Sequence, residues 1–401
     1  MSKHPSPATL TRAQEWALTL CVAVVTANAY YIHPIIGEVA RDFEISEARI
    51  GIVPALNQLA LALGILLLLP LGDIYSNRRL CIIFVSGQTF CMLGMALADG
   101  LALFTLASTL LGFVTIAPYL IPAFASKRVA PARLGQVTAL LTAGVLFGIL
   151  VARVGAGLVA EYADWRIIYW AAFALMVMVT LALPLVMKSE LATSKQHGGS
   201  YARLIASVFH LAREHRDMRI SALIQGLNFA SFTATWLALA LHLTSDAMGY
   251  GTDVVGYLAG IAAISIFSTP RLGRWADKIG ARRARLIVSV VQIAGVSLLY
   301  PLGFHVLTLL VPLLIINMVG PSIDVTGRMT FLALAPEIRT RLTTFYVVAM
   351  FIGGAIGSVA GTATYDAGGW GGTCLLLLAN ALGILALSWH ADRQFRAQEK
   401  W

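Results

Sequence analysis

The sequence predicts an all-α membrane protein with twelve transmembrane helices in two bundles of six helices, and three observations lead to this prediction. The composition is 58% hydrophobic and 12% charged, with a mean hydropathy of +0.78. Ordinary soluble chains carry roughly 25% charged residues, so a soluble protein of this length is excluded. Twelve long apolar segments follow one another along the chain, and a short charged loop occurs once in each half.

Each apolar segment is long enough to cross a bilayer, which takes about 17 to 25 residues per helix. Several segments contain Pro or Gly, which neighbouring helices accommodate in a membrane. The first segment is longer than the apolar part of a signal peptide, so a retained helix is expected rather than a cleaved leader. The predicted spans are residues 14–36, 48–72, 80–99, 101–126, 134–160, 165–187, 219–244, 254–270, 284–304, 306–334, 342–364 and 371–391.

The basic residues predict the orientation of these spans, because cytoplasmic loops carry an excess of Lys and Arg. With the N-terminus inside, all but five of the 29 Lys and Arg residues fall in cytoplasmic segments. The exceptions are Arg41, Arg49 and Arg166 outside and Arg153 and Arg328 within spans. Both termini are therefore expected to be cytoplasmic. The net charge of +9 fits attraction to anionic lipid head groups, and no nucleic-acid partner is expected.

A polar break divides the twelve segments into two sets of six. Residues 1–187 are expected to form the N-terminal bundle, 188–218 a cytoplasmic linker and 219–401 the C-terminal bundle. The linker begins with polar and Gly-rich sequence, as flexible linkers do. Its second part has apolar residues at helical spacing between arginines, which predicts an amphipathic helix on the inner membrane face. These apolar residues are Leu204, Ile205, Val208, Phe209 and Leu211.

A loop that begins with Asp occurs at matching positions in the two halves. The first copy reads PLGDIYSNRR (70–79) and the second GRWADKIGARR (273–283). Asp73 and Asp277 are 204 positions apart, about half the length of the chain. A duplicated set of membrane spans places the binding site between the halves, which then move against each other.

Two adjacent arginines stand five and six residues after each Asp: Arg78 and Arg79, then Arg282 and Arg283. An acid facing the N-terminal end of a helix contributes about 0.3–1 kcal/mol, and the arginines can pair with acids or helix C-termini. Such contacts at the inner surface would form a weak latch that closes the cytoplasmic gate. A pair of solvated basic loops is the alternative interpretation.

The second loop resembles the signature cytoplasmic loop of the major facilitator superfamily, Gly-x-x-x-Asp-(Arg/Lys)-x-Gly-x-(Arg/Lys)-(Arg/Lys). The residues that fill it are Gly273, Asp277, Lys278, Gly280, Arg282 and Arg283. In the first copy, Leu69, Ile74 and Ser76 replace the first Gly, a basic residue and the second Gly. This looser copy and the stretches 148–170 and 334–342 are similar to a bacterial efflux-type branch, close to drug–proton antiporters.

The resemblance implies the major facilitator fold and a location in the plasma membrane (the bacterial inner membrane). It also implies export of a small molecule by alternating access, with protons as the exchanged ion. It implies no cofactor and no metal ion, and a monomer whose other partner is membrane lipid. An importer or uniporter of a metabolite on the same fold remains an alternative, and a non-transporting membrane sensor is a more remote one. No HExxH, GxSxG or clustered His/Asp motif indicates an enzyme.

Ionisable residues inside spans are the first candidates for the binding site, because they are costly in a bilayer unless they are paired or hydrated. Arg153 has no acid in the core of its own span, so it is interpreted as a cavity residue for an anionic or carbonyl-bearing solute, or as a partner of Asp324. Asp324 and Arg328 are four residues apart and can pair on one helix face. That pairing, and a role in substrate or proton binding, are both open.

Polar and aromatic residues at similar depth complete the candidate pocket, since small-molecule sites combine apolar walls with a few polar groups. These candidates are Asn28, Tyr30, Tyr31, Asn57, Gln58, Gln225, Asn228 and Trp236. Span one carries Glu15 only at its cytoplasmic edge. If protons drive transport, Asp324 is therefore the first candidate for the proton carrier and Asp73 the second.

Glycines at four-residue spacing mark the fifth and eleventh spans, at equivalent places in the two halves. Gly144 and Gly148 lie in the fifth span, and Gly353, Gly357 and Gly361 in the eleventh. Residues at this spacing share one helix face, where the absence of side chains lets backbones approach closely. Tight packing and a specific gating role both fit this pattern.

Overall fold

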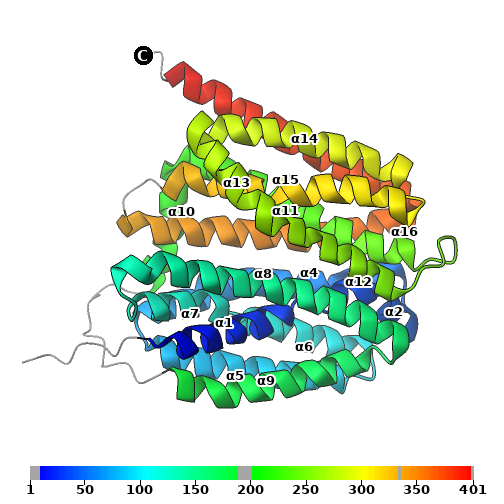
Figure 1. Ribbon diagram of the computed structural model, residues 1–401, viewed down its shortest axis with the longest axis horizontal. Coiled ribbons are helices and arrows are strands. Elements are labelled where there is room, and N and C mark those ends of the chain that lie inside the picture. Colours follow the sequence, from blue (N-terminus) through cyan, green and yellow to red (C-terminus); the bar gives the residue numbers. More distant parts are fainter. Residues whose placement is uncertain (1–9, 188–200, 333–335, 399–401) are drawn as a thin grey trace, which may run out of the picture.

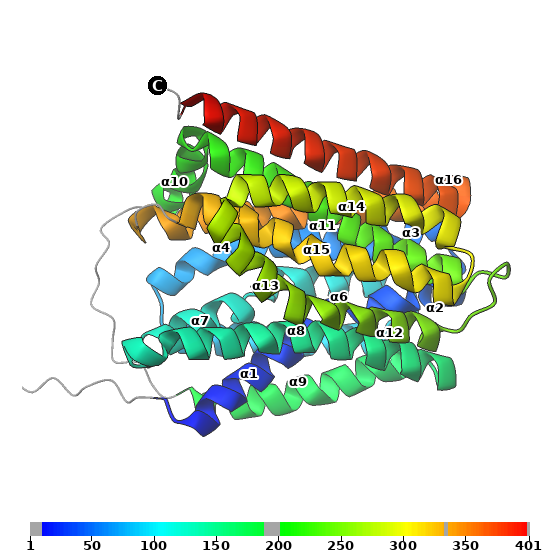
Figure 2. The same cartoon turned by 45° about the horizontal axis from the view of Figure 1, so that its top comes forward.

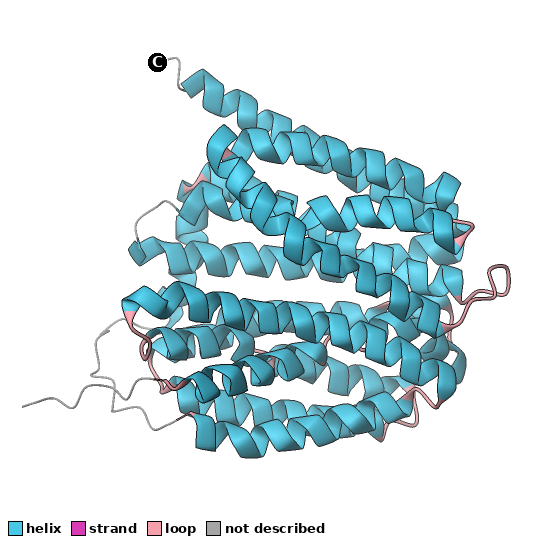
Figure 3. Cartoon of the chain, viewed as in Figure 1, coloured by secondary structure: helices cyan, strands magenta, loops and turns pink. Residues whose placement is uncertain are grey.

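The protein is described by a computed structural model over residues 10–187, 201–332 and 336–398, and this part of the chain contains helices and connecting turns but no strand (Figures 1 and 3). Most helices lie side by side along one axis of the molecule (Figure 1). The prediction of an all-helical membrane protein is confirmed. Within the described residues, eleven segments are long and apolar enough to cross a membrane: Arg12–Asp42, Glu47–Gly72, Asn77–Ala96, Leu101–Ser126, Arg133–Tyr162, Arg166–Val186, Arg216–Leu243, Thr252–Ile279, Ala281–Leu302, Val306–Phe331 and Arg341–Gln394.

The difference from the twelve predicted spans arises in the last helical element, α16 (Pro336–Gln398), which has 63 residues. Two helices meet there at a kink, because Gly368 (φ −143°, ψ 16°) and Gly369 (φ 57°, ψ −154°) leave the helical conformation. The positive φ of Gly369 is accessible to glycine at little cost. In Figures 1 and 2 the orange part of α16 runs towards the right and the red part returns to the left. The predicted spans 342–364 and 371–391 therefore lie on either side of the kink.

The helices before the linker pack mainly in pairs that are separated in the sequence. Contacts are most extensive between α4 and α6, between α1 and α8, and between α5 and α9. Apolar side chains from all of these helices form one continuous buried core. The elements are α1 (Arg12–Ala27), α2 (Ile32–Asp42), α3 (Glu47–Ile50), α4 (Ile52–Leu68), the 3₁₀ turn η1 (Leu69–Asp73), α5 (Asn77–Ala96), α6 (Leu101–Val114), α7 (Ala117–Ser126), α8 (Pro131–Tyr162) and α9 (Arg166–Val186).

After the linker, α11 packs against α16, and α14 packs against α15. The first helix, α10, lies where the amphipathic helix is predicted. It packs on α16 and α11, and its Val208 and Ala212 are buried. Residues 188–200 of the predicted linker lie outside the described residues. The elements are α10 (Tyr201–Glu214), α11 (Arg216–Leu243), α12 (Thr252–Gly260), the 3₁₀ turn η2 (Ile261–Ala263), α13 (Ile264–Ile279), α14 (Ala281–Leu302), α15 (Val306–Leu332) and α16.

Three of the membrane segments are interrupted near their middle. The first breaks at residues 28–31 between α1 and α2, the fourth at 115–116 between α6 and α7, and the eighth at η2. The predicted first span, 14–36, is therefore too short, because α2 continues the segment to Asp42. Irregular backbone at membrane depth is tolerated where it is buried in protein or lines a cavity. We therefore expect these three breaks to lie inside the molecule, beside a cavity.

Glycines bring two helix pairs into close contact, one in each half of the chain. A Cβ atom on Gly148 of α8 would lie 2.2 Å from the carbonyl oxygen of Ala23 in α1. A Cβ atom on Gly357 of α16 would likewise lie 2.2 Å from the carbonyl oxygen of Ala230 in α11. Gly144 and Gly353, four residues earlier, make the corresponding contacts one turn away. The glycine pattern thus produces the same helix–helix approach twice.

The helices before and after the linker meet closely at the end of the molecule where α2 ends and α12 begins (right in Figure 1). There the Glu161 carboxylate accepts a hydrogen bond from the Thr252 backbone N–H at 2.9 Å, and the Thr252 hydroxyl donates to the Gly157 carbonyl at 2.9 Å. Arg41 donates to the Thr244 carbonyl at 3.4 Å.

At the other end, the first residue of α10 contacts the end of α4. The Tyr201 hydroxyl donates to the Leu67 carbonyl, and partial burial raises the pKa of Tyr201 above its ordinary value. The hydroxyl therefore stays protonated and able to donate. Helix α1 begins, and α16 ends, at this same end of the molecule (Figure 1).

Candidate functional site

A cavity of about 410 Å³ lies at the centre, between the helices before the linker and those after it. This volume falls within the range of about 300–1,000 Å³ that is usual for small-molecule sites. Its lining comes mainly from α4, α8, α11, α15 and α16 and from the three interruptions described above, with further residues from α1, α7, α12, α13 and α14. The predicted site residues that line it are Tyr30, Asn57, Gln58, Arg153, Gln225, Asn228, Trp236, Asp324 and Arg328.

Two predicted candidates, Asn28 and Tyr31, lie away from this lining. The side-chain amide of Asn28 donates to Gln88 on α5 at 3.2 Å. The ring of Tyr31 meets Tyr169 edge-on, with the ring centroids 6.5 Å apart. Because the chain turns between α1 and α2, successive side chains diverge here, and Tyr30 alone of the three reaches the cavity. Asn28 and Tyr31 are therefore placed as packing residues between helices.

Arg153 is the most deeply buried charged residue of the cavity, with a side chain on α8 that is 2% exposed. Its Nη2 lies 3.0 Å from Nδ1 of His33. A guanidinium can only donate, so Nδ1 accepts and the neutral His33 carries its proton on Nε2. The Arg153 Cζ also lies over three aromatic rings, 5.4 Å from the ring centroid of Tyr30, 4.7 Å from Phe232 and 4.8 Å from Trp236.

No carboxylate of the described residues forms an ion pair with Arg153. Its Nε is buried and makes no hydrogen bond within the described structure. The predicted alternative, in which Asp324 is its partner, does not occur, because Asp324 pairs within its own helix. A buried donor without a partner costs about 1–3 kcal/mol, and more when the group is charged.

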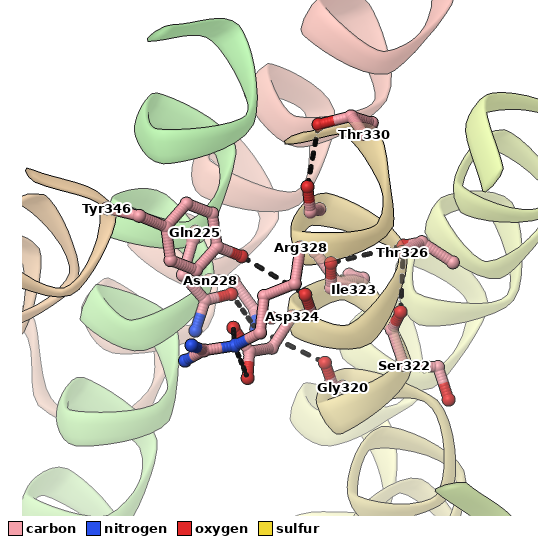
Figure 4. Close-up of polar contacts among 11 residues, drawn as sticks. Gln225, Asn228, Gly320, Ser322, Ile323, Asp324, Thr326, Arg328, Thr330 and Tyr346 are labelled. Atoms are coloured by element: carbon pink, nitrogen blue, oxygen red, sulfur yellow. Dashed lines mark hydrogen bonds and ion pairs between the residues drawn. The ribbon is translucent and has the colours of Figure 1, made fainter. Parts of the chain in front are cut away.

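Asp324 and Arg328 form an ion pair on α15 at the cavity wall (Figure 4). The Arg328 Nε donates to both carboxylate oxygens of Asp324 at 3.0 Å. The two side chains are 27% and 29% exposed, respectively. The Tyr346 hydroxyl donates to the backbone carbonyl of Asp324 at 3.2 Å, and the Arg328 Cζ lies 5.0 Å from the Tyr346 ring centroid. The structure therefore places the predicted pair together, in a position that water and solutes can reach.

A chain of amides runs along the same wall. Gln292 donates to the Asn228 side-chain oxygen at 3.3 Å, and the Asn228 amide donates to Gln225 at 3.3 Å and to the Gly320 carbonyl at 3.2 Å (Figure 4 draws the Asn228–Gly320 bond). Gly320 lies one turn before Asp324 on α15, so these bonds tie α11 and α14 to the helix that carries the ion pair.

Sequence reasoning missed several lining residues, which are Tyr119, Phe229, Phe232, Gln292 and Asn317. The two amides could have been found, since a polar side chain inside an apolar span is itself a signal. The aromatic residues carry no such signal, because rings that face a cavity and rings that pack between helices occur in the same apolar context.

The two arginine-rich turns lie at the end of the molecule where α10 packs. The first leads into α5 and the second into α14. Gly280 separates α13 from α14 with φ of +91°, a conformation that favours glycine. Ser76 precedes α5 with φ of −60°. The first copy therefore does not require glycine at this position, which explains that departure from the signature.

The contacts described for these turns stay within one set of helices. Arg78 donates to the carbonyls of Met187 and Pro184 at the end of α9, the latter at 3.2 Å. Arg282 forms an ion pair with Asp217 in the first turn of α11. The predicted contacts between the two halves at these turns are absent from the described interactions. Four other residues of these turns have exposed side chains: Arg79, Asp277, Lys278 and Arg283. A Cβ atom added to Gly273 would lie 3.7 Å from Cγ1 of Val325, an ordinary contact distance. The side chain of Asp73 is not among those that the structure describes.

One buried residue next to the second turn was also missed. Arg285 is 1% exposed, and its Nη1 donates to the Ser221 hydroxyl of α11 at 2.8 Å. It follows Arg282 by three residues and so shares a face of α14 with it. The Arg282–Asp217 ion pair and the Arg285–Ser221 hydrogen bond connect the start of α14 to the start of α11 and so stabilise the turn before α14.

Comparison with known proteins gives the same picture. The sequence profile described as the Major Facilitator Superfamily matches residues 18–320 and 221–399. The chain is 30% identical over 386 residues to "Uncharacterized transporter YgaY" of Escherichia coli, with 95% of each chain covered. It is 28% identical over 379 residues to "Probable transporter SCO4007" of Streptomyces coelicolor, covering 93% of this chain and 85% of that one.

Among solved structures, the fold is similar to that of the nucleoside transporter NupG, with a TM-score of 0.75 at 16% identity over 95% of this chain and 99% of that one. It is also similar to a bacterial homolog of the human lysosomal transporter Spinster in an inward-facing, unoccupied conformation, with a TM-score of 0.77 at 14% identity over 96% and 97% of the two chains. Because the profile matches from the first membrane segment to the last and a relative is 30% identical along nearly the whole length, this protein belongs to the major facilitator superfamily of membrane transporters.

Proposed function

We propose that the protein exports a small organic solute by alternating access, in exchange for protons, across the inner membrane of a bacterium. The observation that carries this proposal is the central cavity, whose charged and aromatic side chains come from both sets of helices. In transporters built from repeated sets of spans, the solute site lies between the repeats.

The topology that goes with this function has twelve crossings and two cytoplasmic termini. The twelfth crossing is obtained by counting α16 as two helices on either side of Gly368 and Gly369. Residues 1–187 and 219–401 then form two bundles of six, joined by the linker 188–218, and the protein works as a monomer. The excess of basic residues at the end that carries the arginine-rich turns supports this orientation.

The contacts between the two sets of helices support an inward-facing state. They hold together the end opposite to the arginine-rich turns, where Glu161 binds the start of α12 and Arg41 binds the Thr244 carbonyl. In the alternate state this end opens, and the turns that carry Asp73 and Asp277 latch the cytoplasmic end. One arginine of each turn, Arg78 and Arg282, contacts its own bundle here, which is compatible with an open latch.

Asp324 is the proposed proton carrier. It faces the cavity, where water can reach it, and when ionised it holds Arg328. Protonation removes this attraction, so the proton and a solute that contacts Arg328 influence each other through one side chain.

Transport in everted membrane vesicles tests the proposal. Ligands are first selected by their ability to raise the thermal stability of the purified protein, since a ligand that binds the folded form stabilises it. Everted vesicles with an acidic interior are then expected to accumulate the selected solute, and a protonophore is expected to abolish the accumulation. Accumulation in right-side-out vesicles alone would identify an importer, and equilibration that ignores the proton gradient would identify a uniporter.

A further inference from the structure

The charges that line the cavity do not cancel. Its described lining contains three side chains that are charged at neutral pH, which are Arg153, Asp324 and Arg328. Asp324 is already engaged by Arg328, whose Nε contacts both carboxylate oxygens at 3.0 Å. That pair is neutral as a whole, so Arg153 leaves the cavity with one uncompensated positive charge.

The surroundings of Arg153 lack the anion that such a charge requires. The guanidinium is 2% exposed, it makes one hydrogen bond to the neutral His33, and its Nε has no partner. The nearest acid along α8 is Glu161, which is engaged by Thr252 at the closed end. Contacts with the three aromatic faces compensate the buried cation in part, by about 0.5–2 kcal/mol each, but they supply no negative charge to pair with it.

Aromatic rings line the cavity beside this charge, and the Arg153 guanidinium itself lies over the rings of Phe232 and Trp236. Phe232 and Trp236 lie one turn apart on α11 and both line the cavity. Phe229, which also lines it, stacks on Phe232 with the ring planes 16° apart. A positive charge therefore stands among cavity-lining rings that can pack against an apolar or aromatic group.

We propose that the solute is an amphipathic organic monoanion, with a carboxylate or similar group paired to Arg153 and an apolar body against Phe232 and Trp236. This inference rests on the proposed transport function and names the substrate class for the same cavity. A second negative charge would find no further unpaired cation in the described lining, so a dianion is disfavoured. A cation would have to displace Arg328 from Asp324 while lying near Arg153.

The occupant would also connect the two bundles. Arg153 belongs to α8 of the first set of helices, whereas Phe232 and Trp236 belong to α11 of the second. An anion bound between them pairs with a group of one bundle and covers a surface of the other. The same solute thereby favours states in which the two bundles are close at mid-depth.

Equilibrium binding of matched probes tests the charge preference. The full-length protein in lipid nanodiscs is titrated calorimetrically with 2-naphthoate and 2-naphthamide, with indole-3-acetate and indole-3-acetamide, and with the cation 2-naphthylmethylammonium. We expect at least one acid to bind at least tenfold more tightly than its amide and than the amine. Arg153→Gln is expected to remove this preference by weakening acid binding at least tenfold with little effect on the amide.

Two further variants separate charge from structure. Arg153→Lys keeps the charge and should retain part of the preference for acids, whereas Arg166→Gln removes an arginine on α9, away from the cavity lining, and should leave the preference unchanged. If Arg153→Gln does not fold, the binding of acid, amide and amine to the wild-type protein still decides whether the cavity prefers anions. Equal binding of amides or amines, or no binding by any acid of the panel, overturns the inference.

Flux measurements keep this result distinct from a failure of the proposed function. Acids that bind through Arg153 but are not moved by proteoliposomes would uphold the anion site and refute proton-coupled export. A neutral or cationic solute that is exported normally by Arg153→Gln would uphold export and refute the anion site.

Discussion

At the scale of single residues, the ion pair on α15 is the part of the cavity most suited to respond to protons. Asp324 and Arg328 are each between a quarter and a third exposed, so the carboxylate is reachable by water while its partner holds it in place. A fully buried pair would suffer strongly from the loss of one member. A pair on a hydrated cavity wall can lose its negative charge and leave the fold intact.

Asp324→Asn is therefore expected to separate two activities. Without a titrating carboxylate, accumulation driven by the proton gradient should fall at least tenfold. Exchange of solute across proteoliposomes without a gradient should persist, because alternating access itself does not require the proton. The exposed Asp99 on the turn between α5 and α6 offers a matched control, and Asp99→Asn should leave both activities unchanged. Full gradient-driven accumulation by Asp324→Asn would exclude Asp324 as the carrier.

The spacing of residues predicts contacts within one helix but not contacts between distant segments. Asp324 and Arg328 pair as expected, since four residues bring two side chains onto the same helix face. His33 and Arg153, by contrast, are 120 positions apart. Their contact depends on how α2 and α8 are placed, and nothing in either span's sequence specifies that placement.

At the scale of helices, the glycine contacts reveal the duplication in three dimensions. Gly148 of α8 approaches Ala23 of α1, and Gly357 of α16 approaches Ala230 of α11, so closely that a methyl group on either glycine would lie 2.2 Å from a carbonyl oxygen. Membrane helices associate through such close backbone approaches, because lipid provides no hydrophobic drive between apolar surfaces. The two bundles thus use the same device to place the helices around the cavity.

Gly148→Ala is expected to destabilise the protein, because the added methyl would overlap the Ala23 carbonyl and push α1 from α8. Overpacking of this kind typically costs about 1–3 kcal/mol. Gly155, on the same helix, has nothing within 4 Å of a Cβ position, so Gly155→Ala should be neutral or slightly stabilising. Unfolding of both variants in detergent mixtures measures the difference. Equal stability of the two variants would contradict the close contact.

Hydropathy predicts where helices cross a membrane better than where they break. The interruptions at residues 28–31, at 115–116 and at η2 lie inside largely apolar stretches. The two helices of α16 are the opposite case. The sequence predicts two spans there, 342–364 and 371–391, whereas the helical element continues through the Gly–Gly kink and forms one apolar segment, Arg341–Gln394. Apolar composition measures the preference for lipid, and it is insensitive to a local change of backbone direction.

At the scale of the whole molecule, alternating access requires each end to be closed by contacts that are individually weak. At the closed end, Glu161 binds the first backbone N–H of α12, next to the positive end of that helix. At the opposite end, the proposed latch depends on Asp277, which is exposed in this state. Contacts of this type contribute about 0.3–1 kcal/mol each, small enough to be exchanged during a transport cycle.

Substitutions at the two ends should therefore shift the population of states in opposite directions. Glu161→Ala removes the contact to α12 and should favour opening of the end where α12 begins by about 1 kcal/mol, close to a fivefold change in population. Asp277→Asn should favour the inward-facing state by a similar amount and reduce transport at unchanged protein levels. Distances between spin labels on the first turn of α8 and the last turn of α13 report the opening of the end that carries the arginine-rich turns. A shift in the same direction for both variants would contradict this account, and the double variant serves as the control for additivity.

The sequence by itself determined that this is a membrane protein of repeated helical spans, because transfer into lipid depends on composition and segment length, which are local properties. It also determined where the arginine-rich turns lie along the chain and that Asp324 and Arg328 can pair, because these residues are close together in the sequence. Only the tertiary structure decided that Arg153 meets His33, Phe232 and Trp236, and that Asn28 and Tyr31 face other helices instead of the cavity. The physical reason is that helix rotation and the positions of helix breaks are set by packing between segments far apart in the chain.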